Sequence, residues 1–479
     1  MQHSIAIIGG GISGISAALE LERLCPECQI DLYESSGRLG GVLETLKEGP
    51  YLIERGADNF ATLIPDALQL SREIGIEDSL IQPCRDNRRA FVLKNGTPEP
   101  IPLGFSLMQP TQVLPILASR TLSIPGKLRL LGEYFVPPRN ECVKGSMEAF
   151  ESDESLESFA IRRLGREAFE ALVEPIVGGI FTADPSTLSM QATMPQFLKM
   201  EREHGGLIRA ALAGRRKDAE AMSRRASGAR YDQFLAPESG MSDWVNRLAN
   251  KIPRGNVQLD TRVSGLNQTS EGWSVSTGSN NRAYSGIVLA TPASATSRLL
   301  TNVDKEAAEI VGSIHYASSA VVALVLPKSE ILGRTDAFGL ICPSREKRRS
   351  LAISFGSNKY PGRVPKGETL LRIFFGGARD QSVLEMCDAE LLALALREVT
   401  DLLNWRGIQP KWSRVIRWPN AMPQYTLGHT QRVDKLDELL RDYQGISVCG
   451  AAFRGVGIPQ CVRSGRLAAK QVLKDLGAE

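Results

Sequence analysis

Three glycines near the N-terminus have the spacing of a nucleotide phosphate site. Gly9, Gly11 and Gly14 form G-x-G-x-x-G and follow an apolar run, residues 5–8, that is too short for a helix. An apolar run bounded in this way predicts a buried parallel strand. Gly9 would permit a tight turn, Gly11 would let the backbone approach a pyrophosphate, and Gly14 would let the next helix pack closely. The first N–H groups of that helix would face the phosphates.

An acidic residue completes the pattern. Glu34 ends a second apolar run, 20 residues after Gly14, where a carboxylate can accept hydrogen bonds from ribose hydroxyls. Strand, glycines, helix, strand and acid in this order predict a dinucleotide site in an α/β, Rossmann-like domain. The alternative is a glycine turn in an empty unit of the same kind.

The residues after Glu34 indicate which dinucleotide is bound. The run Arg-Leu-Gly-Gly at residues 38–41 resembles the Arg-x-Gly-Gly fingerprint of the flavin-binding, monoamine-oxidase-like superfamily, which lies beside the FAD pyrophosphate. Arginine offers forked donors for phosphate oxygens. Many relatives have a basic residue after Gly-Gly, whereas this chain has Val42, so one phosphate contact is missing. The resemblance implies FAD, because a nicotinamide enzyme has no need of this second motif.

Composition and charge exclude several classes of protein. The chain has 479 residues, enough for two or three domains, and 57 Lys+Arg against 54 Asp+Glu, so nothing favours a nucleic-acid partner. The N-terminus enters a strand almost at once, and no apolar run approaches the ~18 residues of a spanning helix. We therefore expect a cytoplasmic protein, with peripheral contact to the inner face of the cell membrane left open.

The 8 cysteines are scattered along the chain, which is typical of reduced thiols. Cys25 and Cys28 form a C-x-x-C, but they lie where the first helix turns into the second strand, and no second pair accompanies them. We interpret them as part of a plain turn, with metal binding or redox use as the alternative, and expect no metal site.

The middle and the end of the chain carry a closer resemblance. Residues 153–184 contain Asp-Glu-Ser…Phe…Arg-Arg-Leu-Gly and then Glu-Pro…Gly-Ile-Phe. These runs resemble the FAD-dependent protoporphyrinogen oxidase and coproporphyrinogen III oxidase family. Further runs that match this family lie at residues 194–207, 338–343, 375–377, 423–425, 428–429 and 449–469. The resemblance covers essentially the whole chain.

The resemblance implies an α/β fold with three parts: a Rossmann-like FAD-binding domain of the glutathione-reductase and amine-oxidase type, an α+β substrate domain, and a small helical subdomain. The expected boundaries are 1–83, 230–300 and 438–479 for the FAD-binding domain, 84–103, 196–229 and 301–437 for the substrate domain, and 104–195 for the helical subdomain.

Several segments have their own local patterns. Residues 257–263 predict a strand of the FAD-binding domain, and residues 286–292 predict a buried strand that ends in a turn. Residues 315–326 and 369–377 alternate like strands of an antiparallel sheet. The polar and basic residues 213–230 predict a flexible loop.

Residues 104–137 mix apolar and basic side chains with several prolines, which favours short helices. Basic amphipathic pieces with exposed apolar residues suit a membrane surface. The alternative is a small helical subdomain that packs on itself.

The resemblance places a non-covalent FAD on many residues. Residues 56–58 resemble the segment that passes under the isoalloxazine ring. Residues 455–459 lead into a helix that runs through Ala468 and would direct its first amides at the pyrimidine end of the flavin. The expected cofactor-binding residues are Gly9, Gly11, Ser13, Gly14, Glu34, Ser35, Arg38, Gly40, Gly41, Gly56, Ala57, Val263, Thr291, Gly450, Val456, Gly457 and Ile458.

Asp58 is the candidate catalytic residue. By resemblance it lies near the flavin, where it would take part in proton removal or orient pyrrole N–H groups. A carboxylate buried beside a flat apolar slot would have a raised pKa. The alternative is an ordinary helix N-cap.

The expected substrate pocket is an apolar slot. By resemblance it includes Gly339, Ile341, Phe374 and Ala183, where the family often has Gly and where Ala would narrow the slot. Arg88 and Arg89, in an expected hairpin at residues 84–103, are candidates for holding substrate carboxylates, because a buried carboxylate needs a partner. The alternative for this basic cluster is a solvated edge.

The resemblance implies the six-electron oxidation of a porphyrinogen in haem biosynthesis, by three hydride transfers to FAD, with O2 as the final oxidant and hydrogen peroxide released. We favour protoporphyrinogen IX slightly and keep coproporphyrinogen III as the alternative. An amine oxidase, a carotenoid-type desaturase or a non-catalytic escort protein on the same fold stays open. Expected partners beyond the substrate and oxygen are a membrane surface and the terminal chelatase of the haem pathway.

Overall fold

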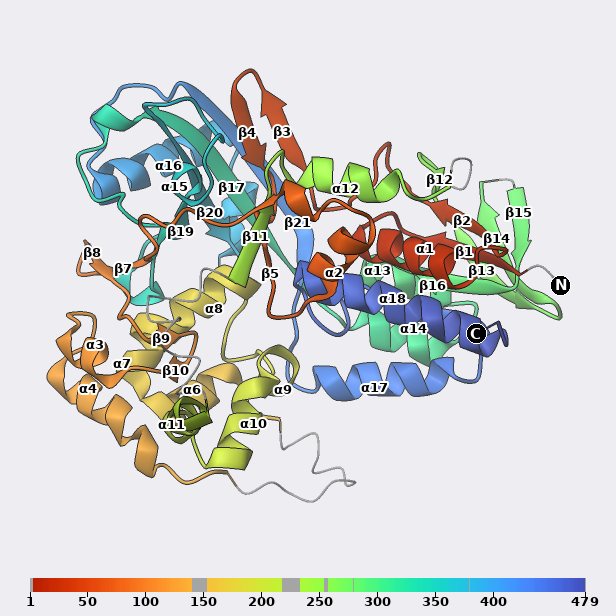
Figure 1. The fold of residues 1–479 in the computed structure, drawn as a ribbon, viewed down its shortest axis with the longest axis horizontal. Coiled ribbons are helices and arrows are strands. Elements are labelled where there is room, and N and C mark those ends of the chain that lie inside the picture. Colours follow the sequence, from red (N-terminus) through yellow and green to blue (C-terminus); the bar gives the residue numbers. More distant parts are fainter. Residues whose placement is uncertain are drawn as a thin grey trace.

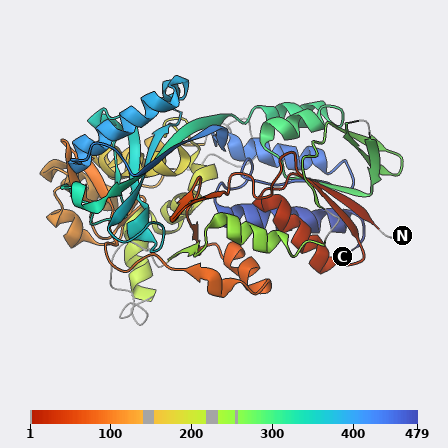
Figure 2. The same ribbon diagram turned by 90° about the horizontal axis from the view of Figure 1, so that it is seen from above.

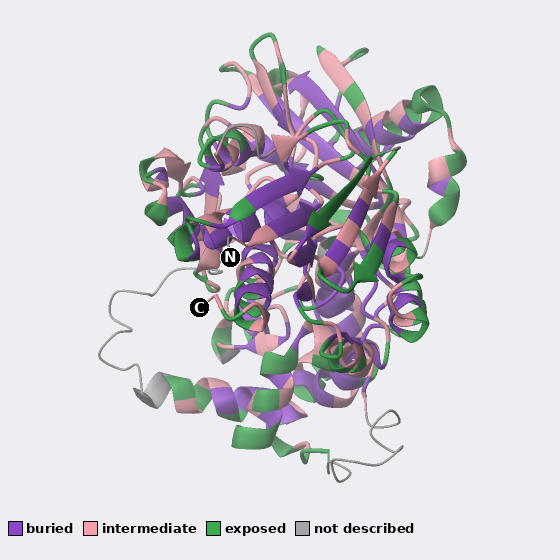
Figure 3. Ribbon diagram, turned by 90° about the vertical axis from the view of Figure 1, so that its right-hand side faces the viewer, coloured by how far each residue is buried: buried purple, intermediate pink, exposed green. Residues whose placement is uncertain are grey.

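Two sheets lie toward opposite ends of an elongated molecule, and a helical unit lies beside the second sheet (Figure 1). This computed structural model describes residues 3–139, 153–217, 233–253, 257–278, 280–378 and 380–478. Buried residues follow the strands and the inner faces of the helices, while the outer helix faces are exposed (Figure 3).

The first sheet is parallel and contains the N-terminal strand. Its order is β12-β2-β1-β16-β22. The strands are β1 Ser4–Ile8, β2 Gln29–Tyr33, β12 Val257–Gln258, β16 Gly286–Leu289 and β22 Ile446–Val448. The predicted apolar runs thus become adjacent strands, which is the order of a doubly wound nucleotide-binding sheet.

Helices and a small sheet cover both faces of the parallel sheet (Figure 2). One face packs against α1 Ile12–Leu24, α2 Asp66–Glu73, α12 Met241–Ala249 and α18 Ile458–Asp475. The other face packs against the antiparallel strands β13 Gly265–Thr269, β14 Gly272–Thr277 and β15 Asn280–Tyr284 and the helices α13 Ala293–Leu300, α14 Lys305–Gly312 and α17 His429–Leu440. A short three-stranded sheet, β5 Phe60–Ala61, β11 Phe234–Pro237 and β6 Leu80–Ile81, adjoins this unit.

The second sheet has seven strands in the order β21-β17-β20-β19-β18-β7-β8, and only the β18–β7 pair is parallel. Its strands are β21 Trp412–Pro423, β17 Tyr316–Pro327, β20 Glu368–Gly376, β19 Ser350–Phe355, β18 Gly339–Ile341, β7 Phe91–Lys94 and β8 Thr97–Pro100. The helix α16 Asp388–Leu403 covers one face. The hairpin β3 Thr45–Glu48 and β4 Tyr51–Glu54 packs on the other. The two strands expected at 315–326 and 369–377 are confirmed as the neighbours β17 and β20.

The helical unit has its own apolar core. It contains α3 Val113–Ala118, α4 Ile124–Leu131, α6 Leu156–Leu164, α7 Arg166–Ala168, a π-helical turn Phe169–Val173, α8 Glu174–Phe181, α9 Met190–Thr193, α10 Pro195–His204 and α11 Leu207–Lys217. The helix α8 also contacts β18 and β19 of the second sheet. The short helices expected at 104–137 are therefore present.

Packing shifts some of the expected boundaries. The helices α14 and α17 share the core of the first sheet, although residues 301–437 were expected in the substrate domain. The helices α10 and α11 pack with the helical unit, because Phe197 and Leu207 belong to its core.

Three local predictions are wrong in part. Residues 213–217 continue α11 rather than beginning a loop, and residues 218–230 lie outside the described residues. In the segment 257–263 only Val257–Gln258 is a strand. Cys25 and Cys28 do lie in the turn between α1 and β2, but they form a disulfide instead of remaining reduced thiols. No helix in the described ranges is long and apolar enough to cross a membrane.

Candidate active site

The glycine loop joins the end of β1 to α1 in the form the spacing predicts. Gly9 has a φ of +112°, and a Cβ there would lie 2.6 Å from the carbonyl oxygen of Ala290. A Cβ on Gly14 would lie 1.9 Å from the Gly9 carbonyl oxygen. A Cβ on Gly11, in contrast, would meet nothing within 4 Å. Gly9 and Gly14 are thus required by the protein's own packing, whereas the space at Gly11 is left for a bound group.

Two helices present free N-termini at this site. Gly11 precedes α1 and Gly457 precedes α18, and neither helix has a side-chain cap. The two helices pack closely because Gly465 has no Cβ, which would otherwise lie 2.1 Å from the Ser13 carbonyl oxygen. Uncapped first-turn N–H groups are good partners for phosphate or for a developing negative charge. This cradle fits the pyrophosphate and the flavin end of FAD.

Glu34 lies at the carboxyl end of β2, as predicted. Its Oε2 accepts a hydrogen bond from the Gly10 N–H at 2.8 Å, and its Oε1 accepts from the N–H of Ser36 at 2.8 Å and the hydroxyl of Ser35 at 3.3 Å. The carboxylate therefore fixes the glycine loop from the side on which a ribose would lie.

The guanidinium of Arg38 is engaged by hydrogen bonds to neighbouring residues of the chain. Its guanidinium donates to the carbonyl oxygens of Leu39, Gly41 and Leu43 and to Glu44. These bonds shape the turn at residues 40–41, whose Gly40 N–H donates to the Gly10 carbonyl at 2.8 Å. The second glycine motif is thus brought against the first, and Arg38 holds the turn in place.

Val263 and Thr291 lie near this loop on neighbouring elements. The segment that leads to Val263 runs beside Glu34, because the Thr261 N–H donates to the Glu34 carbonyl at 2.8 Å. Thr291 follows β16 directly behind Gly9, whose missing Cβ would approach the Thr291 nitrogen at 3.2 Å. The structure therefore brings both residues to the carboxyl edge of the parallel sheet.

Residues 56–58 connect β4, which packs on the second sheet, to β5, which adjoins the first unit. The Gly56 carbonyl accepts a hydrogen bond from Arg372, and Asp58 pairs with Lys359 at 3.2 Å and with Arg372 at 3.5 Å. Burial would raise the pKa of Asp58, but the charges of Lys359 and Arg372 outweigh it and lower the pKa. The expectation of a raised pKa is wrong, because it omitted these two cations.

One face of the seven-stranded sheet carries three of the predicted substrate residues, Gly339, Ile341 and Phe374. Leu340 packs into the core beneath α16, so its neighbours Gly339 and Ile341 face the opposite side. Phe374 on β20 packs on that same side. Ala183 follows α8, and the Thr182 carbonyl accepts from the Ala378 N–H at 2.8 Å, just past the end of β20. Gly339, Ile341, Phe374 and Ala183 are therefore brought to one region.

The two predicted arginine anchors lie at the margin of that region, since the Phe338 N–H, next to Gly339, donates to the Arg89 carbonyl at 2.8 Å. Arg88 donates to the carbonyls of Cys84 and Pro83 in its own turn. Arg89 pairs with Asp336 at 3.4 Å and is 45% exposed.

Sequence reasoning missed two buried polar groups on the substrate face. Ser354 on β19 lies directly opposite Arg372 on β20. The Ser354 hydroxyl and the Arg372 Nε are both buried and without a hydrogen-bond partner in the described part of the chain. A lone arginine inside the apolar strand of residues 369–377 is the signal that could have revealed this pair. Unpaired buried donors are costly, so they mark a place for an acceptor on a bound molecule or water.

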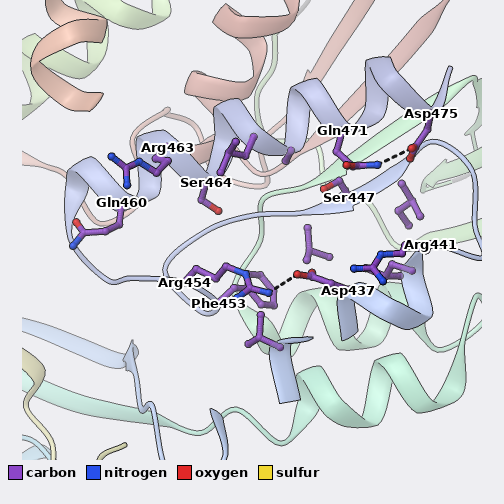
Figure 4. Close-up of a pocket in the computed structure, with 16 residues that line it drawn as sticks. Asp437, Arg441, Ser447, Phe453, Arg454, Gln460, Arg463, Ser464, Gln471 and Asp475 are labelled. Carbon is purple, nitrogen blue, oxygen red and sulfur yellow. Dashed lines mark hydrogen bonds and ion pairs between the residues drawn. The ribbon is translucent and has the colours of Figure 1, made fainter. Parts of the chain in front are cut away.

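A separate groove of about 510 Å³ runs along the outer edge of the parallel sheet, between α17, β22 and α18 (Figure 4). Arg454 and Asp437 pair on one wall, and Gln471 and Asp475 bond on the other. None of the residues expected to bind cofactor or substrate lines this groove.

Comparisons with known proteins match this geometry. The family model described as "Flavin containing amine oxidoreductase" matches residues 12–473. The coproporphyrinogen III oxidase of Bacillus subtilis (strain 168) is 31% identical over 476 residues, which cover 98% of this chain and 97% of that protein. Protoporphyrinogen oxidase 2 of Arabidopsis thaliana is 24% identical, with 98% and 94% covered. The solved structure of a putative protoporphyrinogen oxidase from Exiguobacterium sp. 255-15 has a TM-score of 0.84 at 25% identity and covers 100% of this chain and 99% of its own.

Proposed function

Because this chain belongs to the flavin-containing amine oxidoreductase family and is an FAD-dependent oxidase, we propose that it oxidises coproporphyrinogen III to coproporphyrin III in haem biosynthesis. Six electrons and six protons leave the macrocycle, and three O2 become three hydrogen peroxide. The sequence alone favoured protoporphyrinogen IX. The full-length identity of 31% to the Bacillus enzyme supports coproporphyrinogen III instead, since the Arabidopsis and Exiguobacterium proteins named for protoporphyrinogen are less similar, at 24% and 25% identity.

The side chains of the site bind and orient the substrate in this reaction, while the redox chemistry belongs to FAD. FAD, when bound, supplies the two-electron acceptor for a hydride from a bridge carbon. The chain must bind the macrocycle flat, exclude water and stabilise charge. The apolar side chains of Ile341 and Phe374 suit the first two tasks. Asp58 is ionised, so its role is to accept hydrogen bonds from pyrrole N–H groups.

The four carboxylates of coproporphyrinogen III need partners or water. Arg345, four residues after Ile341, is a further candidate, because its Nε and Nη2 are buried without a hydrogen-bond partner in the described ranges. Burial would raise the pKa of Glu167, but the hydrogen bonds from Ser123 and then the charges of Lys94 and Arg345 lower it, so Arg345 lies close enough to act on a carboxylate. Arg88 and Arg89 stay candidates for carboxylates that remain at the solvent edge.

The test is a comparison of the two porphyrinogens with the same preparation. Each is mixed anaerobically with the FAD-loaded protein, and porphyrin fluorescence is followed after air is admitted. We expect a larger kcat/KM for coproporphyrinogen III. A larger value for protoporphyrinogen IX would reverse the assignment, and no porphyrin from either would overturn it. Amines should reduce the flavin no faster than buffer does.

We also propose that the helical unit touches an anionic membrane surface. Leu114, Ile124, Leu128 and Phe135 are between 64% and 79% exposed and lie on consecutive short elements. Lys127 is interleaved with them, and basic residues beside exposed apolar ones suit a lipid interface.

Flotation with vesicles containing anionic lipid tests this surface. Leu114→Asp with Leu117→Asp should move the protein from the vesicle fraction to the soluble fraction. Leu332→Asp, at a residue 64% exposed in the second sheet's unit, is the matched control and should float as the unmodified protein does. Full recovery of the unmodified protein in the soluble fraction would refute the proposal. The same surface is where we would seek a contact with the chelatase that uses the product.

A further inference from the structure

The loop between β22 and α18 depends on contacts from outside itself. It begins at Gly450 and reaches Gly455, with φ values of +125° and +132°, and then leads to the α18 N-terminus at Gly457. Within the loop the Phe453 N–H donates to the Gly450 carbonyl at 3.3 Å, a long bond. Two hinge-like glycines and a weak internal bond do not define one conformation, although this loop places the amides that would face the flavin.

Tyr425 joins the two ends of this loop. Its hydroxyl donates to the Ala451 carbonyl at 2.7 Å and accepts from the Gly455 N–H at 2.7 Å. The side chain is 2% exposed, so water does not compete for these bonds. One hydroxyl therefore fixes the distance between residues 451 and 455.

His429 holds the middle of the same loop. Its ring stacks on Tyr425, with centroids 4.0 Å apart and planes 14° from parallel, and its Nε2 lies 2.8 Å from the Phe453 carbonyl oxygen. Burial lowers the pKa of His429 to about 4, so the ring is neutral at physiological pH. Its Nδ1 is buried and has no partner in the described part of the chain, so Nε2 carries the proton that the carbonyl accepts.

The segment that carries these rings also contacts the substrate region. Gln424 donates to the Phe181 carbonyl at 3.3 Å, two residues before Ala183, and the Ser189 N–H donates to the Tyr425 carbonyl at 2.8 Å. Residues 424 and 425 thus touch the wall of the proposed pocket on one side and the loop 451–455 on the other.

We infer that Tyr425 and His429 are positioning residues. They hold the loop 451–455 in the conformation that the flavin end of FAD requires, and they fix the position of this loop relative to the substrate pocket. The effect of these residues on catalysis rests on the proposed function, whereas their effect on the loop and on FAD binding does not. Core packing alone would give buried rings, but it would not require three hydrogen bonds to the backbone of residues 451, 453 and 455 of one loop.

Amide hydrogen exchange of the FAD-loaded protein tests the positioning directly. Tyr425→Phe keeps the ring and removes the hydroxyl, so peptides that contain residues 451–455 should exchange about tenfold faster. Tyr443→Phe is the matched control, because it removes a hydroxyl that donates to Asp304 at 3.1 Å, outside the loop. Unchanged exchange at the loop in a folded Tyr425→Phe protein would overturn the inference.

Release of FAD on dilution, followed by flavin fluorescence, gives the second measurement. Tyr425→Phe and His429→Leu should each weaken FAD binding roughly tenfold, as expected for the loss of one or two hydrogen bonds. His429→Gln retains an N–H donor and should bind FAD within about threefold of the unmodified protein. Equal losses for Gln and Leu would mean that only packing matters and would overturn the inference for His429. If neither porphyrinogen is oxidised, the proposed function fails, while the exchange and FAD measurements still decide the role of the loop contacts.

Discussion

The Nζ of Lys359 lies 3.2 Å from Oδ2 of Asp58, and this ion pair defines the polar end of the proposed active site. Arg372 approaches the same oxygen at 3.5 Å. Burial alone would make Asp58 harder to ionise, but the two cations lower its pKa below the ordinary value. A carboxylate in this state is a weak base at neutral pH, so it accepts hydrogen bonds more readily than it removes protons.

The pH dependence of activity should reflect this ion pair. We expect no limb from Asp58 in the kcat/KM profile between about pH 5 and 8, since its pKa lies below about 3.9, the ordinary value for aspartate. Lys359→Met removes one cation, so burial should raise the pKa of Asp58 and bring an acid limb into the measured range. Lys347→Met, at an exposed lysine, is the control. An unchanged profile for Lys359→Met would show that the ion pair does not set this pKa.

The ion pair of Asp58 and Lys359 should also affect the free energy of unfolding at low pH. A lowered folded-state pKa stabilises the protein at pH above the unfolded pKa, and this contribution is lost as the pH falls through the folded value. We therefore expect urea unfolding midpoints of the unmodified protein to fall more steeply below about pH 4 than those of Asp58→Asn. Parallel curves for the two proteins would contradict this expectation.

Gly11 and Gly14 should respond to alanine in different ways. A Cβ on Gly14 would overlap the Gly9 carbonyl, and forcing it in should destabilise the chain by about 1–3 kcal/mol. A Cβ on Gly11 meets no protein atom within 4 Å, and the φ of −69° suits alanine. Gly11→Ala should leave the urea midpoint without FAD unchanged and weaken FAD binding more than tenfold. Normal FAD affinity in this variant would place the pyrophosphate elsewhere.

Arg345 provides a test of carboxylate recognition. If it anchors one propionate, Arg345→Ala should raise the KM for coproporphyrinogen III about tenfold or more, whereas Arg345→Lys should recover only part of the loss, because lysine lacks the forked geometry. Arg348→Ala is the control, since Arg348 already pairs with Asp401 at 2.8 Å. An unchanged KM for Arg345→Ala would remove it from the site, and the same assay on Arg88→Ala and Arg89→Ala would decide the earlier candidates.

The local patterns of the first 41 residues were sufficient to predict the glycine loop, because each element there is determined by neighbours in the chain. Strand β1, Gly9, Gly14 and Glu34 occupy their predicted positions, and strands β17 and β20 lie in the two segments whose alternation predicted strands. These features need only short-range chemistry, which a single sequence displays.

The parts that could not be predicted depend on contacts between distant residues. The pKa of Asp58 is set by Lys359 and Arg372, about 300 positions away in the chain. Arg88 donates to a carbonyl of its own turn, and Arg89 pairs with Asp336. The local sequence pattern does not indicate that Asp336 is the partner of Arg89. The family runs at 423–425 and 428–429 were recognisable, but their bonds to the loop 451–455 appear only in the fold.

The ion pair of Glu133 and Arg163 gives the second arginine of the run at residues 153–165 a structural role in the helical unit. Both side chains are fully buried and bond to each other. Glu133 also accepts the N–H groups of Leu207 at 2.7 Å and Ile208 at 2.9 Å, so it fixes the start of α11. Arg163 further donates to the Val136 carbonyl at 2.9 Å. The pair therefore joins three segments of the helical unit.

Removing one partner of this pair should be far more costly than removing both. Arg163→Met leaves the Glu133 charge buried and unbalanced, so we expect a loss of about 3–5 kcal/mol in the free energy of unfolding. Adding Glu133→Gln should restore a large part of it, because an amide still accepts from the α11 N-terminus without a buried charge. Arg166→Met, at an exposed arginine 3.7 Å from Glu170, is the control and should change stability by less than about 1 kcal/mol. Urea unfolding of the four proteins measures these values, and a double variant no more stable than Arg163→Met would show that lost contacts, rather than the unbalanced charge, cause the instability.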